Sequence, residues 1–124
     1  MEILLLILLL QVKHYYADFA IQSYEQTIRK GEYGNLIGIS HSCDHIAATL
    51  VALLLANFFI TIDPKLILIL ALAEGTAHYH IDWVKMRFGS KNMHSALFWN
   101  QFGLDQLAHQ ATYLLIAYFI ITAQ

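Results

Sequence analysis

The chain has 124 residues, of which 58% are hydrophobic and only 13% are charged, and its formal net charge is -2. Soluble domains carry about 25% charged residues, so this composition fits lipid better than water. The small negative charge, with no basic stripe, argues against a nucleic-acid partner. The single cysteine, Cys43, excludes an internal disulfide and any zinc site built from several cysteines.

The first predicted element starts with an unbroken apolar run over residues 3–10. A cleaved signal peptide begins with basic residues and ends with a small-residue cleavage site, and neither is present here. We therefore expect this run to begin a retained helix.

Four hydrophobic segments follow one another, over residues 3–24, 39–62, 66–84 and 98–123. Each is close to the roughly 20 residues that a helix needs to cross a bilayer. The stretches 50–55 and 66–73 are apolar on every side, which a soluble bundle does not tolerate. The sequence therefore predicts an all-α, integral membrane four-helix bundle that forms a single transmembrane domain over residues 1–124.

The loops predict the orientation of this bundle. The connections 25–38 and 85–97 hold five basic residues, Arg29, Lys30, Lys85, Arg87 and Lys91. The opposite side holds only Lys65, in the turn between the second and third segments. Because basic loops stay in the cytoplasm, we expect both long connections inside and both termini outside, most naturally in a bacterial inner membrane.

Every predicted helix carries a pair of metal-binding residue types spaced i, i+4. The pairs are His14 and Asp18, His41 and His45, His78 and Asp82, and Asp105 and His109. This spacing sets both side chains of a pair on one helix face. In the predicted topology all four pairs lie between the middle of a helix and its cytoplasmic end, so the four faces can converge.

A convergent cluster of this kind indicates a metal site. Each charged side chain inside a bilayer costs at least about 2.5–3.5 kcal/mol and is expected to face the bundle interior with a partner. A divalent transition metal (zinc, iron or manganese, one ion or two) is such a partner for His and carboxylate groups. We predict as ligands His14, Asp18, His41, His45, His78, Asp82, Asp105 and His109. Glu74, one turn deeper than His78, is the candidate general base or the carboxylate that orients a ligand.

Three other interpretations use the same residues. Single polar residues in membrane helices commonly serve as interhelical hydrogen-bonding groups. A non-enzymatic ion or proton conduit, or an accessory membrane subunit, is a second alternative, although a conduit needs polar residues in the exterior halves, which are nearly all apolar. An oxygen-activating di-iron enzyme is a third. Glu74 and His78 are four residues apart, however, and the Glu-x-x-His motif of soluble di-iron bundles requires three.

Some polar residues are expected at the periphery of the bundle. Lys13 and Lys85 are long enough to extend to the lipid headgroups, and Lys85 could alternatively bind an anionic group. Trp83 and Trp99 are placed as an interfacial aromatic belt would be. His94 lies in a connection and is expected in solvent.

The ordered set of motifs resembles the domain of unknown function 3307, a family of small integral membrane proteins of bacteria and phages. The motifs are His14-x-x-x-Asp18-Phe19-x-x-Gln22, His41-x-x-x-His45, His78-x-His80-x-Asp82 followed by Lys85, and Asp105-Gln106-x-x-His109. The resemblance covers nearly the whole chain and implies four spans with polar intramembrane positions. More distantly, the pattern is similar to that of membrane-bound metal-dependent hydrolases.

These observations predict metal-dependent hydrolysis of a membrane-associated substrate, at a site that opens toward the cytoplasm. The predicted partners are the lipid bilayer and that substrate. The metal would supply hydroxide at neutral pH, because it lowers the pKa of bound water to about 7.

Overall fold

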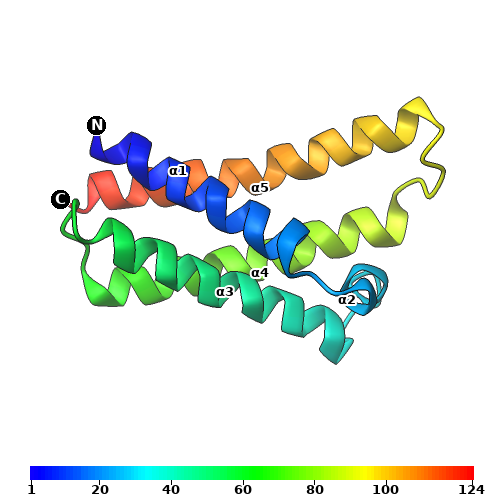
Figure 1. Cartoon of the computed structure of the whole chain (residues 1–124), viewed down its shortest axis with the longest axis horizontal. Coiled ribbons are helices and arrows are strands. Elements are labelled where there is room, and N and C mark those ends of the chain that lie inside the picture. Colours follow the sequence, from blue (N-terminus) through cyan, green and yellow to red (C-terminus); the bar gives the residue numbers. More distant parts are fainter.

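The computed structural model describes residues 1–124, and every regular element in it is helical (Figure 1). The elements are α1 (Glu2–Tyr15), the π-helix η1 (Tyr16–Ala20), α2 (Tyr24–Arg29), α3 (Leu36–Ala56), α4 (Pro64–Phe88) and α5 (Ala96–Thr122). The predicted all-α class is therefore confirmed.

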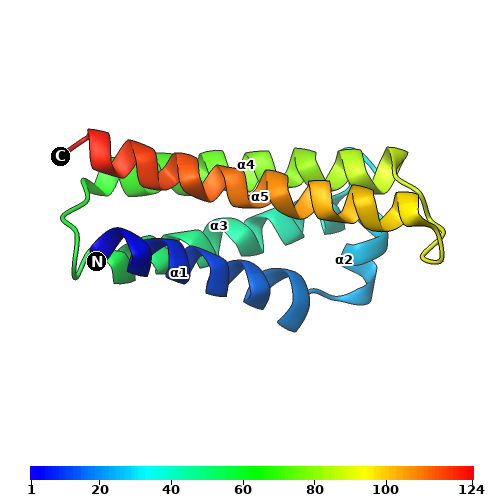
Figure 2. The same ribbon diagram turned by 90° about the horizontal axis from the view of Figure 1, so that it is seen from above.

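The four long helices run alternately up and down and form two layers. Figure 2 shows α4 and α5 in one layer and α1 and α3 in the other. Both termini and the short connection between α3 and α4 lie at one end of the bundle. The connection that contains α2 and the one that joins α4 to α5 lie at the opposite end, so both long connections leave the bundle on the same side.

The first helix is shorter than the predicted segment 3–24, because a new helix, capped by Ser23, begins at Tyr24. Ser23 Oγ accepts a hydrogen bond from the Gln26 N–H at 3.2 Å, and Gln26 Oε1 accepts one from the Ser23 N–H at 2.8 Å. This capping box starts α2, most of which lies within the predicted connection 25–38.

The bounds of the other three helices differ from the predicted ones by one to six residues. α3 begins three residues earlier than predicted, because Asn35 caps it, and ends at Ala56 instead of residue 62. The chain then turns, and Asn57 Oδ1 accepts a hydrogen bond from the Ile62 N–H at 2.7 Å. Asp63 caps α4, which continues to Phe88, four residues beyond the predicted end. α5 likewise begins two residues early, after its Ser95 cap.

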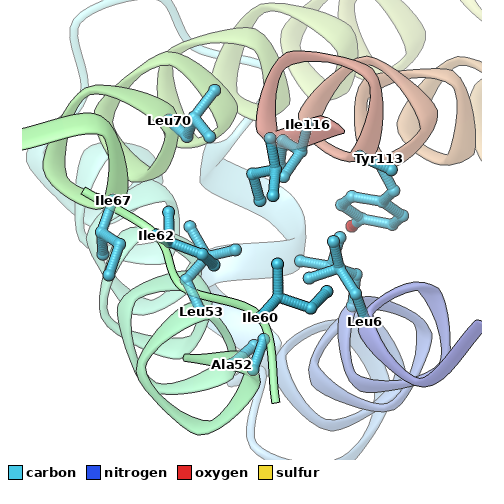
Figure 3. Packing of buried hydrophobic residues seen from close by; sticks show 13 residues of the cluster. Leu6, Ala52, Leu53, Ile60, Ile62, Ile67, Leu70, Tyr113 and Ile116 are labelled. Carbon is cyan, nitrogen blue, oxygen red and sulfur yellow. The ribbon is translucent and has the colours of Figure 1, made fainter. Parts of the chain in front are cut away.

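The half of the bundle near the termini encloses an apolar core, shown in Figure 3. We call its 13 buried residues the apolar cluster: Leu6, Leu10, Ala52, Leu53, Ala56, Ile60, Ile62, Ile67, Leu70, Tyr113, Ile116, Ala117 and Ile120. All four long helices contribute to it, and Ile60 and Ile62 close it from the turn between α3 and α4.

The half of the bundle near the long connections has a polar interior. Twelve of the 29 buried residues are polar or charged: Lys13, His14, Lys30, His41, Ser42, His45, Thr49, Glu74, His78, Asp82, Asp105 and His109. The outward faces of this half are apolar, and Phe19, Leu104 and Leu107 are each at least 56% exposed. This arrangement, polar inside and apolar outside, is the reverse of that in a soluble domain.

Two stretches are long and apolar enough to cross a membrane, Glu2–Ala20 and Leu36–Ala56. α4 and α5 are longer, with 25 and 27 residues, and their polar side chains, charged in α4 and mostly amides and histidine in α5, lower their mean hydropathy.

Candidate metal centre

Close contact between α3 and α4 positions the histidines of both helices. Gly75 faces α3, where a Cβ atom would overlap the side chain of Ile46. The Ser42 hydroxyl donates a hydrogen bond to the Gly75 carbonyl oxygen. Because these helices approach so closely, His45 and His78 stack with ring centroids 3.4 Å apart.

Three imidazoles direct their Nε2 atoms at one carboxylate oxygen. Asp18 Oδ1 lies 3.0 Å from His41 Nε2 and 3.1 Å from His45 Nε2. It lies 3.5 Å from His78 Nε2, which is 3.4 Å from His41 Nε2. We call Asp18, His41, His45 and His78 the first group, and one ligand atom from each lies within 4.8 Å of all the others.

The spacing of the first group is that of ligands around one ion. Zinc–nitrogen bonds of about 2.0–2.1 Å in a tetrahedron place the ligand atoms roughly 3.3–3.4 Å apart. The four distances from 3.0 to 3.5 Å bracket this value. These distances therefore match the ligand spacing of one tetrahedral ion, although the stacked rings of His45 and His78 would have to turn to direct both Nε2 atoms at it.

Asp18 reaches this position from a π-helical turn. The Ile21 N–H donates to the Tyr16 carbonyl oxygen at 3.1 Å, five residues back. Such wider turns occur frequently at functional sites. The sequence carries no signal that distinguishes this turn from ordinary α-helix.

A second set of ligand atoms lies beside the first. Asp82 Oδ1 and Asp105 Oδ1 are each 3.6 Å from His109 Nε2. We call Asp82, Asp105 and His109 the second group. His78 lies between the two groups, because His78, Asp82 and His109 each offer a ligand atom within 4.8 Å of the others. Asp105 joins the second group through its contact with His109.

The second group contains buried polar atoms that make no hydrogen bond. These atoms are Asp105 Oδ1 and both ring nitrogens of His109, whereas Asp82 Oδ2 lies 2.9 Å from Lys30 Nζ. Buried polar groups nearly always have a partner, so each of these atoms requires an explanation. A bound cation between the two carboxylates and the imidazole would satisfy most of them.

Glu74 lies on the other side of the histidines, away from Asp18. Its Oε1 is 3.8 Å from the Nδ1 atoms of both His45 and His78. Its Oε2 accepts a hydrogen bond from Thr49 Oγ1 at 2.9 Å. A carboxylate beside the second ring nitrogen is typical of the groups that orient metal-binding histidines.

Three lysines form ion pairs with three of the four carboxylates of the polar interior, Asp18 being the fourth. These pairs were not predicted from the sequence. Lys13 Nζ lies 2.7 Å from Glu74 Oε1, and Lys30 Nζ lies 2.9 Å from Asp82 Oδ2. Lys85 Nζ lies 3.6 Å from Asp105 Oδ2. The expectation that Lys13 extends to the headgroups is wrong, because this residue is only 6% exposed. The sequence feature that indicates this burial is the position of Lys13 in the last turn of an otherwise apolar helix.

His14, a predicted ligand, contacts other groups with both ring nitrogens. Its Nδ1 lies 2.7 Å from the Tyr113 hydroxyl, and its Nε2 lies 3.1 Å from Gln106 Oε1 and 3.3 Å from Asp18 Oδ2. The structure thus places His14 behind Asp18, outside both groups. Tyr113 and Gln106 were not recognised in the sequence as its partners.

A polar cavity of about 220 Å³ adjoins both groups at the end with the long connections. Its walls include Asp18 from the first group and Asp82 and Asp105 from the second. Lys30 and Lys85 lie in the same wall. The predicted peripheral residue His94 lies away from this cavity, in the exposed connection before α5.

The comparisons with known proteins identify a family and no function. No curated protein and no solved structure significantly matches the chain. A family model described as a protein of unknown function, DUF3307, matches residues 4–124. The chain therefore belongs to the DUF3307 family.

Proposed function

We propose that the chain crosses the membrane four times. The apolar outward faces of all the long helices support this, since lipid is the environment that favours such a surface. The lengths are also sufficient, because 19 residues at about 1.5 Å per residue give about 28 Å, close to a bilayer core of about 30 Å. Tyr33, Tyr79 and Trp83 pack together at the end with the long connections, as aromatic residues do at an interface.

The long connections lie in the cytoplasm in this proposal, and the termini lie outside. Lys30 and Lys85 belong to ion pairs of the interior, but Arg29, Arg87 and Lys91 still outnumber Lys65.

Thiol labelling of intact cells tests this topology. Tyr33→Cys and Met93→Cys, each at a position 64% exposed, should resist a membrane-impermeant reagent when Cys43 is replaced by alanine. Phe58→Cys, at a position 82% exposed near the opposite end, should react. Labelling of Met93→Cys from outside would overturn the orientation.

The interior of the cytoplasmic half is proposed to hold two divalent transition-metal ions. The first group offers four ligands, which is the number of a closed, structural zinc site. The second group offers three protein ligands, which leaves a position open for water, as in catalytic sites. Zinc, iron and manganese all suit a histidine and two carboxylates.

The proposed activity is metal-dependent hydrolysis of a membrane-associated substrate. A metal ion at the second group would supply hydroxide at neutral pH, because it lowers the pKa of bound water to about 7. Asp82 and Asp105 hold that ion at the wall of the polar cavity, where a substrate has room to bind. Glu74 orients His45 and His78 from behind in this proposal, and its pairing with Lys13 argues against a role as general base.

One observation supports this proposal over a conduit. The polar interior ends at Thr49 and Glu74, and the apolar cluster fills the rest of the bundle between them and the termini. A conduit needs polar groups along its whole path, so the structure favours a site that opens on one side only.

An assay with membrane lipids tests the hydrolytic activity. Purified, metal-loaded protein is incubated in detergent micelles with a total extract of bacterial membrane lipids, and the products are identified by mass spectrometry. The proposal predicts loss of at least one lipid species and gain of its hydrolysis product. The variant His109→Ala should abolish this change, and His94→Ala should not. If the extract stays unchanged with the metal-loaded protein, this proposed activity is wrong.

A further inference from the structure

A second, larger cavity lies beside the polar one. It has a volume of about 460 Å³ and runs between α4 and α5 in the half of the bundle near the long connections. Its walls are largely apolar and include Ile81, Val84 and Phe88 from α4 and Leu104 and Ala108 from α5. In the proposed membrane orientation, this groove faces the acyl chains of the inner leaflet.

The two cavities meet at one ion pair. Lys85 and Asp105 are the only residues that line both of them. Lys85 forms the weakest of the three lysine–carboxylate ion pairs, because its 3.6 Å distance to Asp105 is the longest. A rotation of the Lys85 side chain would therefore connect the apolar groove with the polar cavity above the second group.

The charges of the interior favour an anion once metal is bound. Four carboxylates (Asp18, Glu74, Asp82 and Asp105) face three lysines (Lys13, Lys30 and Lys85). With neutral histidines this set is negative by one charge, and a single divalent ion makes it positive. Lys30 and Lys85 both line the polar cavity. Lysine ammonium groups commonly bind phosphate in proteins.

We propose that the substrate is a phosphate-bearing lipid that enters sideways between α4 and α5. Its acyl chain lies in the apolar groove, and its phosphate binds Lys85 and Lys30 beside the second group. This inference deepens the proposed hydrolytic function and rests on it for the reaction, but lipid binding is measured separately from metal content and from turnover.

Native mass spectrometry of the metal-loaded protein in nonionic detergent provides the test, with phosphatidic acid as the probe. We expect phosphatidic acid to bind at least about tenfold more tightly than diacylglycerol, which has the same acyl chains but lacks the phosphate and its charge-assisted hydrogen bonds. Lys85→Gln removes the charge and should weaken binding by about tenfold. Ala108→Trp fills the groove and should weaken it by a similar factor without removing a charge.

Two matched variants serve as controls. Lys65→Gln removes an exposed lysine near the opposite end, and Leu107→Trp adds a bulky ring on the outward face of α5, at a position 61% exposed. Both should bind phosphatidic acid as the unmodified protein does. Metal content and thermal denaturation, measured for every variant, identify any that fails to fold.

Several outcomes would contradict the inference. Equal binding of diacylglycerol would exclude recognition of the phosphate, and unchanged binding by Ala108→Trp would exclude the groove. Full competition by glycerol 3-phosphate, at concentrations equal to those of the lipid, would show that a water-soluble phosphate is the ligand. If phosphatidic acid binds as expected but the metal-loaded protein releases no hydrolysis product from it, the lipid site stands and the proposed hydrolytic function fails.

Discussion

The same four helices build two interiors of opposite character. Near the termini they enclose Leu53, Ile116 and the rest of the apolar cluster, which packing alone holds together. Near the long connections they enclose the first and second groups and the three lysines, which must satisfy each other's charges. In a bilayer the lipid offers no hydrophobic driving force between helices, so packing and polar contacts carry the association. The two halves should therefore respond differently to metal and to substitution.

Removal of metal should have the largest effect, and it should be confined to the polar half. A ligand at about 1,000 times its dissociation constant stabilises a protein by about 4 kcal/mol, and chelation removes that contribution. We expect a lower Tm in detergent, together with loss of amide protection around His45 and His78. Amides around Leu53 and Ile116 should keep their protection in hydrogen exchange. Equal loss of protection in both halves would contradict the division.

Truncation of the apolar cluster should have the reverse effect. Leu53 is completely buried, and Leu53→Ala should destabilise the protein by about 2–5 kcal/mol through the cavity that it leaves. Metal content should stay unchanged, because Leu53 belongs to the apolar cluster and to neither group of candidate ligands. Leu54→Ala, at the neighbouring position that is 55% exposed, is the control and should change Tm little.

Gly75→Ala should affect both the packing and the metal groups, since it forces α3 and α4 apart where His45 and His78 meet. Overpacking of this kind costs about 1–3 kcal/mol. The added Cβ atom overlaps Ile46, so the double variant Gly75→Ala, Ile46→Ala should recover part of the lost stability. Gly103→Ala adds a Cβ atom with no neighbour within 4 Å and should be harmless in thermal denaturation. Absence of any rescue by Ile46→Ala would contradict the proposed overlap.

Thr49→Val should have the smallest effect. It removes the hydrogen bond to Glu74 Oε2 and keeps the shape of the side chain. Interhelical hydrogen bonds in membranes average about 0.6 kcal/mol, so the expected change in the free energy of unfolding is of that size. Thr76→Val is the control, because the Thr76 hydroxyl bonds only to a carbonyl oxygen of its own helix. A loss above about 2 kcal/mol would mean that Thr49 does more than bond to Glu74.

The sequence predicted the helices and the inward-facing pairs for the same reason. Both depend on local spacing, which is visible within about 20 residues of the chain. His41 and His45, or Asp105 and His109, share a face in any helix. The structure indeed buries both histidines of α3 and both residues of the pair on α5.

The lysine partners depended on contacts that local spacing does not encode. Lys13 meets Glu74 61 residues later, and which carboxylate a lysine reaches depends on how the helices are rotated against each other. The sequence predicts that an unpaired carboxylate in this interior requires a metal ion as its partner. Only Asp18 is unpaired in this sense, because the other three carboxylates have lysines beside them. The division of the ligands into two groups, and the π-turn that carries Asp18, likewise follow from tertiary packing.

The most direct test of the account is the metal content of the purified protein and two variants. Elemental analysis, after purification without chelator, should find about two transition-metal ions per chain in the unmodified protein. His109→Ala should retain about one, held by the first group, while His41→Ala should lose the ion of that group, and His94→Ala should retain both. Protein that holds no metal, and takes up none when zinc, iron or manganese is added back, would contradict the metal centre and leave the polar half as a network of hydrogen bonds and ion pairs.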